Sequence, residues 1–247
     1  MAKDANYDGV EVMISNDKDT RDIQVLKKLE DKYQMPVLSF HAPVLLLTHF
    51  VWGTDPEVKL AKSAELARDM GADTVVVHPP FAIQKKYSTV FLPLVKALEE
   101  RTGVKIAVEN MFPWKIQGRE AVAYKPSWQD ITDITANITL DFSHAALSGL
   151  DSVETVRRLG EKVSHIHLCD GFGTKTKKGV EKDKIFDEHL PPGAGNQPVK
   201  ETLRLLADSN WHGSIVSEIN TRKYKTYEDK RVVLAEAVEF TRAIFSA

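Results

Sequence analysis

Short runs of apolar and β-branched residues alternate along the chain with longer segments of helical periodicity. Several short runs are apolar almost throughout, which is typical of strands covered on both faces in a parallel sheet. We predict strands over residues 9–15, 36–42, 73–78, 105–110, 137–142, 163–169 and 214–219. We predict helices over residues 22–33, 55–70, 88–101, 127–134, 151–159, 198–209 and 227–245. Repeated alternation with short connections predicts an α/β fold.

The predicted architecture is a TIM-type (β/α) barrel. Such a barrel has eight parallel strands, and seven are visible in this sequence. Residues 6–9 have the pattern of a helix end leading into a strand. We therefore expect the first strand of the usual eight to be missing, through a truncated start or an incomplete barrel. An open doubly wound sheet is the alternative. No linker or repeat marks a second domain, so we expect one domain over residues 1–247.

Composition narrows the class of protein. The formal net charge is −2, which gives no electrostatic footprint for nucleic acid or anionic lipid. Cys169 is the only cysteine, which excludes an intramolecular disulfide and suits a reducing cytoplasm. The polar start lacks the core of a signal peptide, and no apolar run approaches the ~20 residues of a membrane span. We expect a soluble cytoplasmic protein and leave homo-oligomerisation open.

Ionisable side chains lie near the carboxyl ends of six consecutive predicted strands. They are His41, His78, Glu109, Asp141 (with His144 three residues later), His167 and Glu218. In a parallel barrel these strand ends converge on one face. Burying so many ionisable groups together is costly unless they are paired or bind a metal. Mixed carboxylates and imidazoles suit zinc, manganese, iron or cobalt better than magnesium or calcium. We therefore predict a divalent-metal site.

Other polar residues are assigned with less support. His165 alternates with His167, so we expect it on the opposite side of its strand and leave it out of the site. His49 and His212 fall in loops and are expected to be structural or solvated. In the long loop after the sixth visible strand, Asp187 and His189 are two residues apart and could reach one ion. The lysine-rich residues 175–184 are expected to be a solvated face, with a phosphate-attracting lid as the alternative.

The motifs that carry these residues resemble the xylose isomerase-like barrel superfamily. They are Val-Glu-Asn (108–110), Leu-Asp-Phe-Ser-His (140–144), His-Ile-His-Leu-Cys-Asp (165–170), Asp-Glu-His-Leu-Pro-Pro-Gly-Ala-Gly (187–195) and Ser-Glu-Ile-Asn (217–220). That superfamily includes sugar and sugar-phosphate isomerases and epimerases, inositol-catabolism enzymes and endonuclease IV. The whole chain looks most like the bacterial proteins called sugar phosphate isomerase/epimerases.

Resemblance to the isomerase and epimerase branch implies one divalent ion and an acid/base pair. The ligands of that ion, which would be zinc, manganese or cobalt, fall on Glu109, Asp141, His167 and Glu218. The metal would bind the oxygens of a small ketose or sugar phosphate and stabilise an enediolate, while Glu109 and Glu218 exchange the proton. Substrate contacts would come from His144, Arg222 and the aromatic Trp114; Trp114, like Phe81 and Phe112, suits either stacking on a sugar or packing.

Two other interpretations stay open. In the endonuclease IV branch three zinc ions cleave a phosphodiester at abasic DNA. That ligand pattern falls on His41, His78, Glu109, Asp141, His144, His167, Asp187, His189 and Glu218. The slightly negative charge, the short chain and the apolar segment 42–47 argue against nucleic acid as a partner. A non-catalytic metal-binding barrel is the third interpretation. Our prediction is the metal-dependent sugar isomerase or epimerase.

Overall fold

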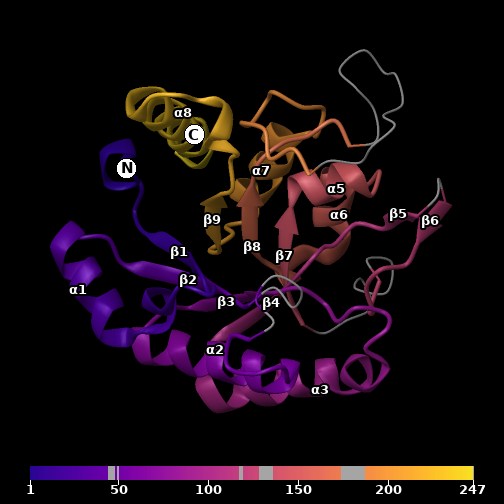
Figure 1. Cartoon of the computed structure of the whole chain (residues 1–247). Helices are drawn as coiled ribbons and strands as arrows, with labels where there is room; N and C mark the ends of the chain where they lie inside the picture. Colours follow the sequence, from indigo (N-terminus) through magenta and orange to yellow (C-terminus); the bar gives the residue numbers. More distant parts are fainter. Residues whose placement is uncertain (44–47, 49, 117–118, 128–135, 174–186, 247) are drawn as a thin grey trace.

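The computed structural model describes residues 1–43, 48, 50–116, 119–127, 136–173 and 187–246. Seven parallel strands form one curled sheet in the order β1-β2-β3-β4-β7-β8-β9, with the helices outside it (Figure 1). Neighbouring strands follow one another along the chain, apart from the separate two-stranded β5–β6 hairpin. A doubly wound sheet would reverse its strand order at a switch point. The fold is therefore a nearly closed TIM-type barrel, and the prediction is confirmed.

The elements have the following bounds. The barrel strands are Val10–Met13 (β1), Val37–His41 (β2), Thr74–Val77 (β3), Lys105–Glu109 (β4), Asn137–Asp141 (β7), Val163–Leu168 (β8) and Ser214–Ser217 (β9). The hairpin strands are Trp114–Ile116 (β5) and Arg119–Ala121 (β6). The α-helices are Ile23–Tyr33 (α1), Pro56–Met70 (α2), Lys85–Thr102 (α3), Phe142–Leu147 (α5), Ser152–Leu159 (α6), Val199–Asp208 (α7) and Tyr227–Phe245 (α8). Short 3-10 helices are Lys3–Ala5 (η1), Lys18–Arg21 (η2), Gly160–Lys162 (η3) and Thr221–Lys223 (η4).

Local signals in the sequence set the helix boundaries. Asp55 caps α2 by accepting from the Glu57 backbone N–H, and Pro56 occupies the first turn. The same helix ends at Gly71, whose φ of 77° would cost conformational energy for any residue other than glycine.

No helix in the described part of the chain is long and apolar enough to cross a membrane.

Some predicted elements differ from the observed ones. α3 begins at Lys85, three residues before the predicted start. The helix predicted over residues 127–134 lies, apart from Ser127, outside the described residues. α5 was not predicted, because residue 142 was assigned to the preceding strand; the Asp141 side chain accepts from the His144 backbone N–H and begins this helix instead. The β5–β6 hairpin was also missed.

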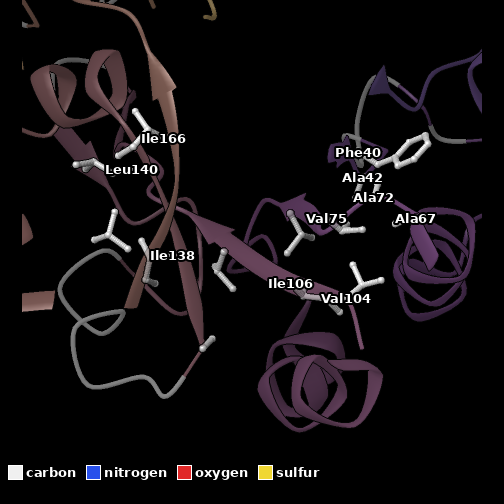
Figure 2. Close-up of a cluster of buried hydrophobic side chains, with 14 of the residues drawn as sticks. Phe40, Ala42, Ala67, Ala72, Val75, Val104, Ile106, Ile138, Leu140 and Ile166 are labelled. Atoms are coloured by element: carbon white, nitrogen blue, oxygen red, sulfur yellow. The ribbon is translucent and has the colours of Figure 1, made fainter. Parts of the chain in front are cut away.

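The barrel strands bury apolar residues on their outer side, against the helices. Phe40, Ile106, Leu140 and Ile166 are all fully buried in this layer (Figure 2). Because side chains alternate along a strand, the residues on either side of each of them point into the barrel. Most of those inward positions, including Ser39, His41, Asp141, His165 and His167, carry polar or ionisable side chains, and the apolar layer outside holds the strands that position them.

A seam separates the first and last barrel strands. The pairings of the described residues join β1 to β2 and β9 to β8, and do not join β1 to β9. A cavity of about 500 Å³ lies between these two strands, lined by Glu11 from β1, Val216 from β9 and Ala237 from α8. The ring is thus open along one side, and α8 lies over the opening.

Candidate metal centre

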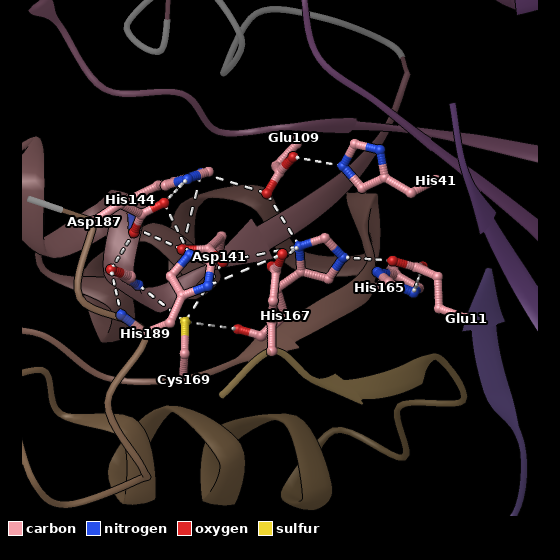
Figure 3. Close-up of polar contacts among 12 residues, drawn as sticks. Glu11, His41, Glu109, Asp141, His144, His165, His167, Cys169, Asp187 and His189 are labelled. Carbon is pink, nitrogen blue, oxygen red and sulfur yellow. Dashed lines mark hydrogen bonds and ion pairs between the residues drawn. The ribbon is translucent and has the colours of Figure 1, made fainter. Parts of the chain in front are cut away.

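Four side chains from four strand ends form a central group. The ligand atoms of Glu109, Asp141, His167 and Glu218 all lie within 4.8 Å of one another. His167 Nδ1 is 3.0 Å from Glu109 Oε1 and 2.9 Å from Glu218 Oε2 (Figure 3). Three of the four side chains are almost completely buried, and Glu218 is partly exposed. The barrel therefore brings together the residues that the resemblance assigned to a single ion.

The charges of this group favour a cation. Burial raises the pKa of Asp141. His144 lowers this pKa, the negative charges of Glu218 and Glu109 raise it, and the resulting value is about 6. Three carboxylates this close repel one another unless a positive charge lies between them. Carboxylate and imidazole ligands together suit zinc or another first-row divalent metal. The four residues thus fit such an ion and would hold it.

Asn110 fixes two of these ligands relative to each other. Its side-chain amide donates from Nδ2 to the Asp141 carbonyl (3.0 Å) and accepts at Oδ1 from the Asp141 backbone N–H (2.6 Å). The amide thereby continues the hydrogen-bonding pattern between β4 and β7 beyond the last paired residues. This contact explains the asparagine of the Val-Glu-Asn motif.

A second group lies beside the central one. His41 Nε2 and His78 Nε2 are 3.4 Å and 2.8 Å from the same oxygen, Glu109 Oε2. Burial lowers the pKa of His78, although Glu109 acts in the opposite direction. A neutral imidazole is the form that binds metals. Glu109 is shared by both groups, so it could bridge two ions.

A third group contains the two loop residues. His144 Nε2 and His189 Nε2 lie 3.1 Å and 2.8 Å from Asp187 Oδ2, and Ser143 Oγ donates to Asp187 Oδ1 (2.5 Å). Ligand atoms of Asp141, His144 and His189 also lie within 4.8 Å of one another. All nine residues of the endonuclease IV-like pattern therefore lie in one continuous cluster.

Asp170 holds the loop that carries Asp187 and His189. The Asp170 and Leu190 backbones exchange two hydrogen bonds of 2.8 Å. The Asp170 carboxylate accepts from the backbone N–H groups of Gly193 (3.0 Å) and Gln197 (3.1 Å). Gly195 packs so closely that a Cβ there would lie 2.2 Å from Asp170 Oδ1. Asp170 thus acts on the site through the loop.

The prediction for His165 was wrong. Residues two apart on a strand point to the same face, so His165 points into the barrel with His167. Their ring centroids are 5.2 Å apart, and both lie near Glu11 (Figure 3). Glu11 was missed altogether. Glu109 was identified by its place at the carboxyl end of a predicted strand, whereas Glu11 lies inside one, between Val10 and Val12; the available signal was a carboxylate within an apolar strand.

The other predicted residues are placed as follows. Trp114 is about one-third exposed and lies with Phe81 (5.7 Å between ring centroids) and Tyr124 (6.2 Å). Tyr124 in turn meets the His78 ring edge-on at 6.4 Å. Arg222 is exposed in η4, so its substrate contact remains a prediction.

The remaining predictions concern loops and packing. Phe112 lies 5.0 Å from the His144 ring, and His212 is exposed in a loop, as expected. Residues 44–47, His49 and the lysine-rich residues 175–184 lie outside the described residues.

Comparison with known proteins identifies relatives along the whole length. A model of the family described as xylose isomerase-like TIM barrel matches residues 1–244. An uncharacterized protein of Mycobacterium tuberculosis is 40% identical over 255 residues, covering 96% of this chain and 88% of the relative.

Two solved structures share the fold. One is described as a D-tagatose 3-epimerase-like protein; it has a TM-score of 0.65 and 24% identity, with 96% of this chain and 91% of that chain covered. The other is the IOLI protein with a bound zinc atom, with a TM-score of 0.67, 17% identity, and coverage of 99% and 90%.

Proposed function

The chain belongs to the xylose isomerase-like TIM barrel family, and we propose that it is a divalent-metal-dependent isomerase or epimerase of a small sugar or sugar phosphate. The observation that carries this proposal is the convergence of Glu109, Asp141, His167 and Glu218. The likeness to an epimerase-like protein and to a zinc-bound barrel supports the substrate class and the metal.

The acid/base chemistry is assigned to Glu109 and Glu218. When bound, a divalent ion would supply Lewis-acid stabilisation of negative charge on the substrate oxygens. One glutamate removes a proton from the carbon next to the carbonyl, and the other delivers a proton to the carbon that accepts it. Both carboxyls keep a lowered pKa, because the neighbouring imidazoles outweigh the effect of burial. Both are therefore ionised near neutral pH, so either can act as the base; the glutamate that delivers a proton must first take one up, either from the substrate or from the solvent.

The substrate is assigned to the side of the central group on which Glu218 is partly exposed. His144 is a donor beside Glu109 (3.3 Å between His144 Nδ1 and Glu109 Oε1) and would contact a hydroxyl. The aromatic rings of Trp114, Phe81 and Tyr124 form an adjoining apolar surface on which a sugar face could stack. A compact polyol with one polar and one apolar face matches these surroundings.

The proposal is tested by metal content and proton exchange. Purified protein should carry one zinc, manganese or cobalt ion per chain and should incorporate deuterium from heavy water into one member of a panel of ketoses and ketose phosphates. Glu109→Gln and Glu218→Gln should slow exchange on the order of 10²–10⁴-fold. The exposed Glu161→Gln is the matched control and should exchange normally. A metal-loaded protein with no exchange on any ketose would contradict the proposal and favour a non-catalytic barrel.

A second candidate is a trinuclear zinc phosphodiesterase. The specific observation is that His41 with His78, and His144 with Asp187 and His189, form further groups on either side of the central one. Three zinc ions per chain together with cleavage of abasic-site DNA would select this function. One ion per chain with deuterium exchange would select the isomerase or epimerase.

A further inference from the structure

A second polar layer lies inside the barrel below the central group. It consists of Glu11 from β1, Ser39 from β2 and His165 from β8. His165 lies two residues before His167 on β8, Ser39 lies two residues before His41 on β2, and Glu11 pairs in register with Ser39. Ser39 Oγ donates to Glu11 Oε2 (2.6 Å), and His165 Nε2 lies 3.3 Å from the same oxygen. Neither the acid/base pair nor the substrate contacts proposed above involve this layer.

His167 spans the two layers. Its Nδ1 faces Glu109 and Glu218, whereas its Nε2 lies 3.2 Å from Glu11 Oε1. A neutral imidazole has one N–H and one lone pair, and the hydrogen bond made by one nitrogen decides which nitrogen can bind a metal. Both nitrogens of His167 face carboxylates, which only accept, so both carry hydrogen in the metal-free protein. When a metal replaces the hydrogen on Nδ1, the hydrogen on Nε2 stays bonded to Glu11.

Glu11 is itself held firmly for this task. Its side chain is about 10% exposed, and a carboxylate this buried needs compensating partners. His167 Nε2 lies 3.2 Å from Glu11 Oε1, and His165 Nε2 lies 3.3 Å from Glu11 Oε2. The Ser39 hydroxyl donates to Oε2 as well. The result is an acceptor at a defined position behind the His167 ring.

We propose that Glu11 is a positioning residue that orients His167 and fixes its Nε2–H form, so that Nδ1 binds the metal. This inference rests on the metal centre of the proposed function. Carboxylates that accept from a metal-bound histidine raise its basicity, and losing one typically costs about 10–100-fold in metal affinity. Glu11 would thus act on the ion through His167, without contacting it.

The test uses zinc titration of the metal-free chain. Glu11→Met, which removes the acceptor, should weaken zinc binding about 10–100-fold without reducing the number of ions bound. Glu11→Gln keeps an acceptor oxygen and should recover part of this loss. Glu161→Gln should bind as the wild type does. Unchanged affinity in Glu11→Met, or the loss of a whole zinc equivalent, would overturn the proposal; in the second case Glu11 would be a ligand.

A second measurement does not depend on the folding of a variant. In zinc-loaded wild type, long-range ¹H–¹⁵N spectra of the histidines, assigned with His165→Asn, should show His167 with Nδ1 on zinc and hydrogen on Nε2. The opposite arrangement would overturn the proposal. If the wild type takes up no zinc, the proposed function fails separately. A slowly exchanging Nε2–H of His167 should then still appear in the wild type and be lost in Glu11→Met.

Discussion

His144 and Asp187 are 43 positions apart in the sequence, yet His144 Nε2 lies 3.1 Å from Asp187 Oδ2. The same carboxylate oxygen lies 2.8 Å from His189 Nε2. One carboxylate therefore links α5, the helix capped by Asp141, to the long loop after β8. Replacing it should affect both histidines.

Asp187→Asn should reduce the stability of the metal-free protein in a pH-dependent way. Burial lowers the pKa of His189, but Asp187 outweighs burial and raises it to about 9 from an ordinary value of 6.5. A raised folded-state pKa stabilises the fold below the unfolded value, and this contribution is lost as pH rises through the folded value. The variant should be less stable than the wild type by about 1–3 kcal/mol at pH 6.5, and the difference should shrink as the pH rises from 6.5 to 9. Urea denaturation with a chelator measures this; a difference that stays constant with pH would contradict it.

Gly195→Ala should displace the loop that carries Asp187 and His189. The new Cβ would lie 2.2 Å from Asp170 Oδ1 and 2.4 Å from the Gly171 backbone nitrogen, and such overpacking costs about 1–3 kcal/mol. Zinc titration should show loss of any ion bound through the loop, while the central ion is retained. Gly103→Ala is the control for destabilisation alone. Its φ of 72° makes alanine strained there, but no atom lies within 4 Å of the added Cβ and the residue lies away from the site, so the zinc stoichiometry should stay at the wild-type value.

Metal binding should strengthen as pH rises from 5 to 8 and should release protons. The pKa of Asp141 is about 6 in the metal-free protein. Despite burial, the carboxylates around His167 raise its pKa well above the usual value. Since a metal binds only the deprotonated forms, protons must leave as the ion enters. Calorimetric titration in two buffers of different ionisation enthalpy counts them. Binding without proton release would show that these two residues are not ligands.

Leu140→Ala should destabilise the fold without removing the metal site. Leu140 is fully buried in the outer apolar layer, and truncating such a side chain costs about 2–5 kcal/mol. Its inward-pointing neighbour, Asp141, keeps its own partners. Denaturation should report the loss of stability, and zinc stoichiometry should stay at the wild-type value. A loss of zinc in the folded variant would show that the two layers are not separable.

Much of the barrel could be predicted because its signals are local. Most barrel strands are short apolar runs, and six of the seven end near an ionisable residue that the sequence places there. Convergence of those ends follows from the parallel topology alone, so Glu109, Asp141, His167 and Glu218 were expected to meet, and they do. Whether they bind a metal is a separate prediction.

The missed features depend on contacts between distant segments. Glu11 meets His165 and His167 only because the sheet curls until β1 approaches β8. Glu11 and His167 are 156 positions apart in the sequence. The prediction for His165 failed for a different reason: residues two apart on a strand were placed on opposite faces, although they share one face. The β5–β6 hairpin has three-residue strands, too short for a periodic signal.

The Asn110 amide has a consequence for how tightly the centre is built. A planar group of fixed bond lengths, joined at both of its ends to the Asp141 backbone, acts as a spacer between two neighbouring strands. The interval between the backbones of residues 110 and 141, next to two of the candidate ligands, is therefore set by a rigid amide. An aspartate at position 110 would have the same shape but would lack the N–H donor. The hydrogen bond to the Asp141 carbonyl would be lost, and the ends of β4 and β7 would be held together less firmly.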